Sequence, residues 1–429
     1  MSTRHIAYVC ADPGIPVFGT KGASIHVQSV VRAALKAGHR VTLLATRFGG
    51  ECPRGLEGAV CVQLPELPQG DPEKRARAAL DARPQMSALL DAHAPYDLVY
   101  ERYSLWSDVG MRWARAHGIP GVLEVNAPLI EEQRTHRGLV LEDEAMAVAG
   151  SAFSQASALV GVSPGVAAYL RTWPGTEGRV HVVANGVDPE AHAAGAAARL
   201  ARGADAALTA PTAQDAASTP ASAPGQATPA GQAAASAAPS QSAGPVVGFL
   251  GTLKPWHGLP LLVDAFARLN RLHPGTRLLV VGDGPERATM EAALQAQGLL
   301  SQCEFTGAVQ AHEVPALLAR MDIATAPYPQ QENFYFSPLK IYEYLASGLP
   351  VVTTRVGHLD TVVLDGVDGV LVEPGDPDAF AAAMARLLQD PALRLKMGQA
   401  GRARIQARHS WDAVTAHLLG IADASRATL

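Results

Sequence analysis

The chain has 429 residues, too many for one typical domain and suited to two domains of moderate size. Hydrophobic residues make up 48% of it, so each domain can build a large core. The formal net charge is −5 and no long basic run occurs, which argues against nucleic acid as a partner.

Seven short apolar runs lie in the first 190 residues, each bounded by Gly, Pro, Asn or Asp. They predict strands at 5–10, 40–46, 60–65, 97–103, 121–126, 158–163 and 180–184. The stretches between several of them predict helices over 24–37, 72–93, 107–117, 139–157 and 164–171.

The first of these strands ends in a glycine-rich loop, CADPGIPVFGTKGAS, before a predicted helix. The loop nearly matches a phosphate-binding Walker A motif, but Thr20 precedes Lys21 and Gly22 follows it, where the motif needs Gly-Lys-Ser/Thr. A P-loop NTPase therefore remains a distant alternative. We favour a turn at which Gly19 and Gly22 let a ligand approach backbone amides.

Residues 191–243 differ in composition from the rest of the chain. They are rich in Ala, Pro, Ser, Thr, Gln and Gly, contain no aromatic residue, and carry no charge after Asp215. Such a segment buries too little apolar surface to offset its ordering entropy, so we predict a disordered linker. An Ala-rich helix over 193–208 is the alternative for its first part, because the prolines begin only at Pro211.

The pattern of strands and helices resumes after this segment. Further apolar runs predict strands at 245–251, 277–284, 303–307, 322–328, 349–354 and 369–376. Continuous apolar strands that alternate with helices indicate parallel sheets covered on both faces. We predict two doubly wound α/β domains, residues 1–188 and 244–408, with a ligand site in the cleft at their strand ends.

Two lysines, a histidine and a glutamate follow strands of the second domain. Lys254 and His257 lie in the loop after the first strand, and Lys340 starts a helix at Pro338–Leu339. These cations and the helix dipole could hold a diphosphate, with Glu343 accepting hydrogen bonds from adjacent ribose hydroxyls. The alternative is an ordinary surface pair between Lys340 and Glu343, and the pattern alone does not decide between them.

The stretch VVGDGPER, at the end of the second strand of this domain, supports dinucleotide binding only weakly. Arg287 stands where the fingerprint needs a third glycine. Pro285 in a first helical turn and Asp283 near the cap explain the stretch structurally. We keep Gly284 as a candidate donor-binding position.

Five motifs in order resemble the donor-binding half of GT-B retaining glycosyltransferases of family 4. They are ANGVD (184–188), GTLKPWHG (251–258), VVGDGPE (280–286), SPLKIYEYLASGLPVV (337–352) and DGVDGVLVEPGD (365–376). Residues 19–46 and 100–105 resemble the acceptor half. The resemblance implies a GT-B fold, a nucleotide-diphosphate sugar as donor, a sugar or lipid-linked acceptor, and a role in polysaccharide or glycoconjugate biosynthesis.

The resemblance also assigns roles to residues at the matching positions. Lys254 and His257 stand where the family has an Arg and a Lys on the diphosphate, and Glu343 matches the second Glu of its E-x7-E motif. Tyr335 replaces the first Glu, which normally holds the donor sugar. If these changes are not tolerated, the chain is a nucleotide- or glycan-binding relative with little turnover.

The chain resembles the SPLK-containing subgroup, which implies donor contacts from Ser337, Leu339 and Lys340 in place of the missing Glu. The histidine that the family places near the reacting carbon is also absent from its usual region. Asn126, in LEVNAPLIEEQ, is the nearest polar candidate there. We therefore expect Lys340, Lys254 and Asn126 to be catalytic.

The family implies transfer without a metal or other cofactor. The one D-x-D, Asp376 to Asp378, reads better as a helix N-cap than as a metal site. The four cysteines contain no C-x-x-C pair and suit a reducing compartment. The sequence also shows no signal peptide and no apolar window of membrane-spanning length. We expect a cytoplasmic protein, with peripheral contact to the inner face of the membrane left open.

The last predicted helix lies within residues 409–426. Trp411, Val414, Leu418 and Ile421 recur at helical spacing. By resemblance, this helix crosses back to the first domain. We expect Trp411 to pack on the second domain and Leu418 and Ile421 to contact residues 1–185.

Overall fold

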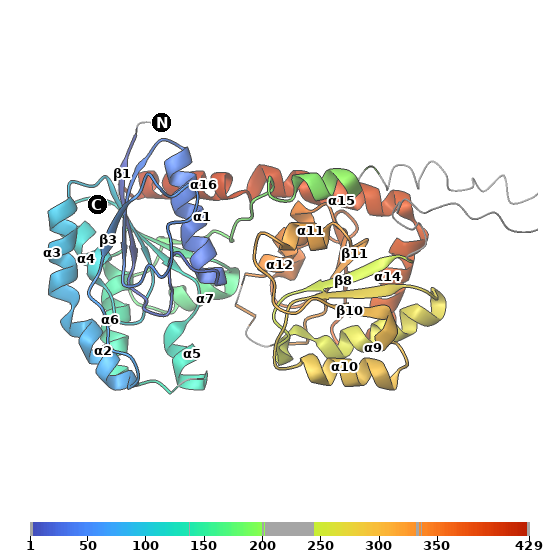
Figure 1. The fold of residues 1–429 in the computed structure, drawn as a ribbon. Helices are drawn as coiled ribbons and strands as arrows, with labels where there is room; N and C mark the ends of the chain where they lie inside the picture. The colour runs from blue at the N-terminus through green and yellow to red at the C-terminus, as the bar shows by residue number, and fades with distance from the viewer. Residues whose placement is uncertain are drawn as a thin grey trace, which may run out of the picture.

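The computed structural model describes residues 3–136, 138–199, 201, 244–331, 334–335 and 337–426. These residues form two α/β domains that stand side by side, the first in blue to green and the second in yellow to red (Figure 1). Each domain is built on one parallel sheet with helices on both faces. This confirms the predicted fold class.

The sheet of the first domain has seven strands in the order β3-β2-β1-β4-β5-β6-β7. The strands are β1 (His5–Cys10), β2 (Arg40–Ala45), β3 (Val60–Gln63), β4 (Leu98–Arg102), β5 (Gly121–Val125), β6 (Ala158–Gly161) and β7 (Val180–Val182). Cys10 pairs with Ala45 on one side and Arg102 on the other, so the carboxyl ends of the central strands meet at one edge.

The helices of this domain follow the prediction with two differences. They are α1 (Gly22–Lys36), α2 (Pro72–Asp81), α3 (Arg83–His93), α4 (Val109–Ala116), α5 (Leu129–His136), α6 (Glu142–Gln155) and α7 (Pro164–Arg171). The single helix predicted over 72–93 is two helices, because Pro84 has no amide hydrogen for the carbonyl of Leu80. The prediction missed α5.

The second domain repeats the arrangement with six strands in the order β10-β9-β8-β11-β12-β13. The strands are β8 (Val246–Leu250), β9 (Arg277–Val281), β10 (Cys303–Phe305), β11 (Ile323–Ala326), β12 (Val351–Thr354) and β13 (Gly369–Val372). The helices around them are η2 (Pro255–His257), α9 (Leu259–Leu272), α10 (Arg287–Ala296), η3 (Leu300–Gln302), α11 (Val314–Leu318), α12 (Leu339–Ala346), α13 (Leu359–Val362), α14 (Pro377–Gln389) and α15 (Pro391–Arg408).

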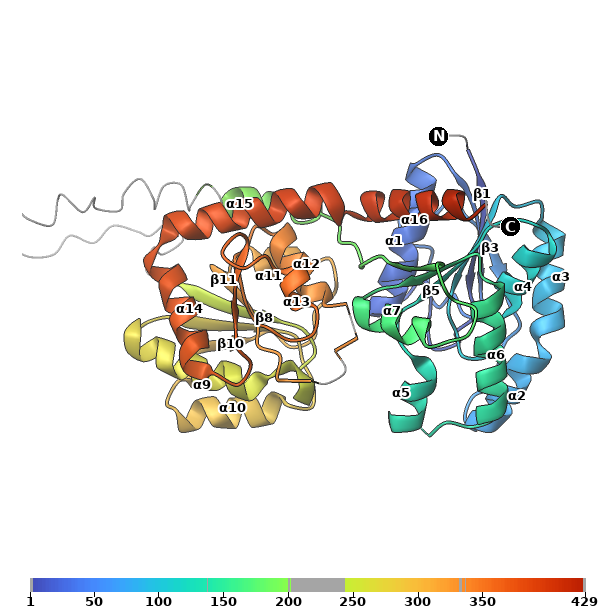
Figure 2. The ribbon, with the colours of Figure 1, turned by 180° about the vertical axis from the view of Figure 1, so that it is seen from behind.

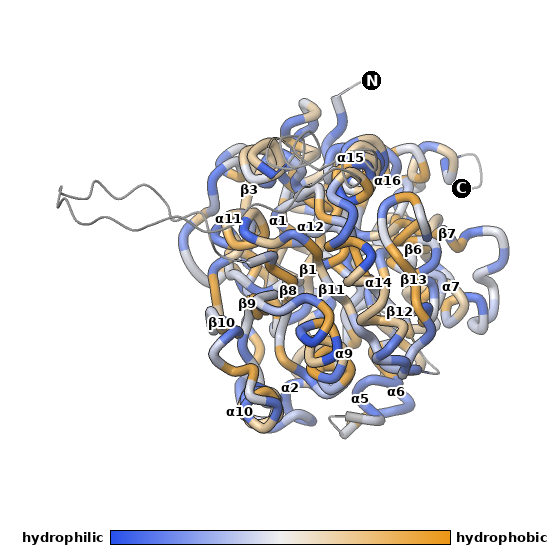
Figure 3. The backbone as a smooth tube through the Cα atoms, turned by 90° about the vertical axis from the view of Figure 1, so that its right-hand side faces the viewer, coloured by the Kyte–Doolittle hydropathy of each residue, from blue (hydrophilic) through white to orange (hydrophobic). Residues whose placement is uncertain are grey.

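Both sheets are buried between their helices. In Figure 3 the hydrophobic colour runs along strands such as β11, β12 and β13, while the outer loops carry more of the hydrophilic colour. β5 and β6 have no exposed residue, and the same holds for β11 and β12. Within the described ranges, no helix combines the length and the apolar character needed to cross a bilayer.

Strand order reverses between β1 and β4 in the first sheet and between β8 and β11 in the second. At such a switch point the adjacent connections leave to opposite faces of the sheet, which leaves a crevice at the carboxyl ends. The loops after β1, β4, β8 and β11 are therefore the places where the fold itself favours a ligand.

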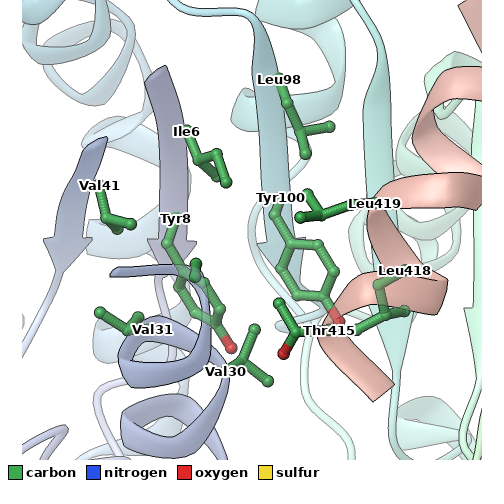
Figure 4. Close-up of a pocket in the computed structure, with 11 residues that line it drawn as sticks. Ile6, Tyr8, Val30, Val31, Val41, Leu98, Tyr100, Thr415, Leu418 and Leu419 are labelled. Carbon is green, nitrogen blue, oxygen red and sulfur yellow. The ribbon is translucent and has the colours of Figure 1, made fainter. Parts of the chain in front are cut away.

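The last two helices join the domains along one side (Figure 2). α15 lies on the second domain, and α16 (Trp411–Ser425) lies on the first. Figure 4 shows Thr415, Leu418 and Leu419 of α16 directed at Tyr8 and Tyr100 of the first sheet, around a small cavity of about 20 Å³. Ile421 belongs to the same apolar cluster as these residues.

The two connections between the domains run beside each other. Val187 donates its amide hydrogen to His409 O at 2.8 Å, and Trp411 donates to Val187 O at 3.2 Å. The Trp411 ring lies on Gly186, where a Cβ atom would come within 2.7 Å of it, and meets His26 of α1 edge-on at 5.0 Å. The expectation that Trp411 packs on the second domain is therefore wrong, because the chain has already passed to the first domain before it reaches Trp411.

The predicted disordered segment begins too early at residue 191. Residues 193–199 are helical, which agrees with the Ala-rich alternative. The buried Arg199 holds this helix on the second domain by donating to the carbonyl oxygens of Leu318, Met321 and Ser347. Residues 202–243, which make up most of the predicted linker, lie outside the described residues.

Candidate active site

The loop after β8 and the loop after β9 are tied together at the switch point of the second domain. Gly251 donates to Val281 O and Leu253 donates to Asp283 O, both at 2.9 Å. Gly284 lies against this junction, because a Cβ atom there would come within 2.5 Å of Leu253 O. Gly284 thus has a packing role.

Gly258 brings the same loop against the end of β11. Its φ is +69°, and a Cβ atom there would come within 1.6 Å of Pro327 O. Only glycine fits this position. The close approach places Lys254 and His257 beside the segment that leads to α12.

Lys340, on the first turn of α12, points into this junction rather than into solvent. Its side chain lies over the rings of Phe249 at 4.3 Å and Tyr328 at 5.3 Å, and its Nζ lies 3.0 Å from where a Cβ atom of Gly251 would be. Only 8% of the residue is exposed, and Nζ has no hydrogen-bond partner among the described residues. Burial lowers the pKa of Lys340 to about 7, although Glu343 opposes the shift.

Glu343 lies one turn further along α12 and is half-buried. Burial raises its pKa to about 7, against the effect of Lys340. Among the described residues the two side chains form no ion pair within 4.0 Å, and Lys340 is buried, so they are not the surface pair of the alternative interpretation. Both charged groups are therefore available to a ligand.

His257 is held in one tautomer. Its Nδ1 lies 2.5 Å from Thr252 O, and because a carbonyl oxygen can only accept, Nδ1 carries the hydrogen and Nε2 is the free acceptor. Burial, together with Lys340 and Lys254, lowers its pKa to about 4. Lys254 is half-buried, with Nζ 5.6 Å from the centroid of the exposed Trp256 ring.

The segment before α12 reaches the first domain. Tyr335 donates its hydroxyl hydrogen to Glu132 Oε1 of α5 at 2.6 Å, and its carbonyl oxygen accepts from Ser163 Oγ at the start of α7. A Cβ atom on Gly165 would come within 2.9 Å of Tyr335 Cα. Tyr335 thus joins the two domains.

The N-termini of α1 and α12 also meet across the domain boundary. A Cβ atom on Gly22, the first residue of α1, would lie 4.0 Å from Leu339 Cδ1, at the first residue of α12. Gly19 closes a turn in which its amide group donates a hydrogen bond to Pro16 O at 2.8 Å. Ser337, two residues before α12, has a buried hydroxyl oxygen. Two positive helix ends therefore face the same region.

Asn126 belongs to a charged network that the sequence analysis missed. Its Nδ2 donates to Glu124 Oε1 at 2.5 Å, and Arg102 Nη1 donates to the same oxygen at 3.1 Å. Glu124 Oε2 accepts from the Tyr100 hydroxyl and lies 2.8 Å from His26 Nε2. The buried Glu124 thus has four partners at the carboxyl ends of β4 and β5.

This network gives Glu124 an unusual acidity. Burial alone would raise its pKa, but His26, Arg102 and Tyr100 outweigh burial and lower the pKa to about 2. Part of the signal was present in the sequence, because Arg102 and Glu124 are charged residues near the ends of largely apolar strands. Nothing in the sequence indicated that His26, on a neighbouring helix, would join them.

The D-x-D pair has structural partners. Asp376 is the N-cap of α14, as predicted, and accepts from Ala379 N at 2.8 Å. Asp378 pairs with Arg268 at 2.6 Å. Over the described ranges, no cluster of three or more His, Cys, Asp or Glu side chains is arranged to hold a metal ion.

Comparison with known proteins assigns each half of the chain to a related family. The family described as Glycosyltransferase Family 4 matches residues 20–191, and that described as Glycosyl transferases group 1 matches residues 244–390. The 2-deoxystreptamine glucosyltransferase of Streptomyces kanamyceticus is 35% identical over 162 residues, which are 38% of this chain and 41% of that protein. The chain thus spans about two fifths of the length of this curated relative.

Solved structures match over both domains. Sucrose-phosphate synthase from Thermosynechococcus elongatus has a TM-score of 0.66 at 20% identity, covering 99% of this chain and 100% of that one. HepE from Anabaena, in complex with UDP and glucose, has a TM-score of 0.63 at 17% identity, covering 98% and 100%. At these identities the likeness establishes the shared two-domain fold.

Proposed function

The chain belongs to the GT-B glycosyltransferases of family 4, and on that premise we propose that it transfers a sugar from a nucleotide-diphosphate donor to an acceptor hydroxyl with retention of configuration. The donor would bind to the loops after β8 and β11, and the acceptor to the first domain. The solved complex of HepE with UDP and glucose, which shares the fold, supports this class of donor.

The observation that carries the proposal is the state of Lys340. Its ammonium group is buried and has no hydrogen-bond partner within the described ranges. Such a group is unfavourable, so proteins rarely keep one without a use for it. A diphosphate at this position would supply the missing negative charge and hydrogen-bond acceptors. The positive end of α12 and the side chain of Lys254 would act in the same direction.

The proposed chemistry needs electrostatic stabilisation more than a protein nucleophile. The bond between the anomeric carbon and the diphosphate oxygen breaks, and its electron pair goes to that oxygen. The acceptor oxygen bonds to the anomeric carbon on the same face, and its proton moves to the departing diphosphate oxygen. Lys340 and the amides at the start of α12 would stabilise the charge that develops there.

His257 would contribute differently from a lysine. With Nδ1 committed to Thr252, its neutral ring offers Nε2 as an acceptor only. A bound diphosphate would favour the protonated ring, which can donate from Nε2. We propose that Glu343 accepts hydrogen bonds from the ribose hydroxyls, and that Ser337, Leu339 and Tyr335 border the donor sugar.

On the acceptor side, Asn126 would contact the acceptor or the donor sugar near the reacting carbon. Its side chain is fixed by Glu124, so its direction is set before substrate binds. Gly19 and Gly22 would allow the donor close to the start of α1. A role in polysaccharide or glycoconjugate biosynthesis agrees with this site.

A thermal-shift screen tests the donor class. UDP, GDP, ADP and dTDP, with their common sugar conjugates, are added with and without Mg²⁺, because a ligand of the native state raises the melting temperature. We expect stabilisation by one nucleoside diphosphate series without added metal, and loss of that stabilisation in Lys340→Ala. Release of the nucleoside diphosphate from the donor, measured with candidate acceptors, separates a transferase from a binding protein. A response only to ATP with Mg²⁺ would contradict the proposal.

A further inference from the structure

A cavity of about 310 Å³ lies at the carboxyl-end edge of the first sheet. It is bordered by the residues that follow β1, β2 and β4, by α2, and by the segment from α5 to α6. Its volume is in the range of small-molecule sites, and its position is where a doubly wound fold binds ligands. The β1–α1 loop that carries Gly19 and Gly22 begins at its wall, at Ala11–Gly14.

One part of the cavity wall is apolar. This wall is formed by side chains from three separate segments, Met86, Leu105, Trp106, Leu129, Leu139 and Val140. Trp106, Leu129, Leu139 and Val140 remain only partly buried, although such side chains are usually covered. A ligand that covered them would gain the free energy of removing this surface from water.

Another part of the wall is polar. Asp12, Ser104 and Gln133 supply a carboxylate, a hydroxyl and an amide, which suit the hydroxyl groups of a sugar. The two charged side chains of the cavity, Asp12 and Arg75, have opposite signs. The cavity therefore has no net charge with which to select a ligand, and its apolar wall is the distinguishing feature.

We infer that this cavity binds an amphipathic acceptor, a hydroxylated group whose alkyl or aryl aglycone lies on the wall formed by Trp106, Leu129, Leu139 and Val140. A free sugar would leave that wall exposed to water. An acceptor with an apolar aglycone covers it while its hydroxyl group remains near Asp12, on the side of the β1–α1 loop. This inference rests on the proposed transferase function, because only a transferase has an acceptor. The preference for an amphipathic ligand can be measured without turnover.

The test compares two probes that differ only in the aglycone, methyl and octyl β-D-glucopyranoside, below the micellar concentration of the latter. Calorimetric titration of the full-length protein measures both affinities. Each buried methylene strengthens binding about fourfold, so burial of three would favour the octyl probe about 60-fold. Trp106→Ala and Leu139→Ser lie in loops and should reduce this preference at least fivefold.

Leu272→Ser is the matched control, because Leu272 is 62% exposed and lies at the end of α9 in the other domain. It should leave the preference unchanged. Equal affinity for the two probes, no binding of the octyl probe, or an equal preference in all three variants would overturn the inference. Nucleoside diphosphate binding is measured in parallel. If a nucleoside diphosphate binds but the preference for the octyl probe is absent, only this inference fails. If the octyl probe is preferred but neither donor binding nor turnover is found, only the proposed function fails.

Discussion

Lys340 and Glu124 are both buried, charged and placed near strand ends, yet their surroundings are opposite. Glu124 accepts from or contacts four polar side chains, and its pKa is lowered to about 2, so the folded protein stabilises its charge. Lys340 has aromatic rings around it and no hydrogen-bond partner among the residues that the structure describes, and burial lowers its pKa to about 7. A buried charge with polar partners within the protein belongs to the scaffold, whereas a buried charge without such partners indicates a ligand.

From this contrast we expect that replacement of Lys340 lowers activity but leaves the stability of the fold nearly unchanged. Lys340→Ala should lower kcat/KM for the donor by about 10²–10³-fold, the scale of losing one preorganised electrostatic contact. The free energy of unfolding should change little, because removing an unpaired buried cation offsets the lost packing. Steady-state kinetics and urea unfolding measure the two effects. Turnover at the wild-type level would remove Lys340 from the mechanism.

Glu124 should behave in the opposite way. Glu124→Gln leaves Arg102 buried without its carboxylate, and removal of one partner from a buried ionic network costs about 3–5 kcal/mol of unfolding free energy. Urea unfolding at pH 7 measures the loss, and Lys340→Met serves as the contrasting variant. An unchanged unfolding free energy in Glu124→Gln would show that the network contributes nothing to the scaffold.

The pH dependence of stability sharpens the same contrast. The pKa of Glu124 is depressed in the folded state, so its contribution is present above its unfolded pKa and is lost as the pH falls toward about 2. The wild type should therefore lose more stability than Glu124→Gln between pH 5 and pH 3, an interval set by the shift in this pKa. Parallel curves for the two proteins would contradict the assignment.

Nucleotide binding should take up protons through Lys340. Because its pKa is about 7, most of the Lys340 side chains are neutral near pH 8, and an anion would bind the charged form. Calorimetry in buffers of different ionisation enthalpy measures the uptake, to which Lys340 can contribute at most one proton. Lys340→Arg should remove the part of the uptake that belongs to Lys340, since arginine stays charged, and leave only the part that His257 contributes. Glu343→Gln, which removes the neighbouring carboxyl group, should retain the uptake by Lys340.

The smallest expected effect concerns the contact between the domains. Tyr335→Phe removes the hydrogen bond to Glu132, which corresponds to about 0.5–1.5 kcal/mol, or about 2–10-fold in a rate or affinity. If this contact helps to hold the domains together, the rate of transfer should fall and nucleotide affinity should stay the same. A fall in nucleotide affinity alone would instead place Tyr335 on the donor.

The sequence predicted the fold well because the strands are short, apolar and bounded by breakers. The run GVLEV, for example, could be placed as a buried strand from its neighbours alone. The placement of Lys340 and Glu343 on one helix was also predictable, whereas their roles toward a donor stay a prediction. The segment over 193–199 was misjudged because its order depends on Arg199 and distant carbonyl groups, not on its own composition.

The contacts of the first domain were much less predictable, for a physical reason. Glu124, Arg102 and Tyr100 come from neighbouring strands, but His26 joins them from α1 and Tyr335 reaches Glu132 from the other domain. Contacts between residues this far apart in the chain depend on how whole elements pack. Local pattern rules, such as spacing along a helix, contain no information about them.

The most direct test of the account is the selectivity of Lys340 for a diphosphate. Calorimetry compares UDP with uridine, and GDP with guanosine, in the wild type and in Lys340→Met, which keeps the length of the side chain and removes the charge. The account predicts that the wild type prefers one nucleoside diphosphate over its nucleoside, and that Lys340→Met reduces this preference at least about 100-fold while remaining as stable as the wild type. A variant that keeps the full preference would contradict the central claim that this buried cation binds the donor phosphates.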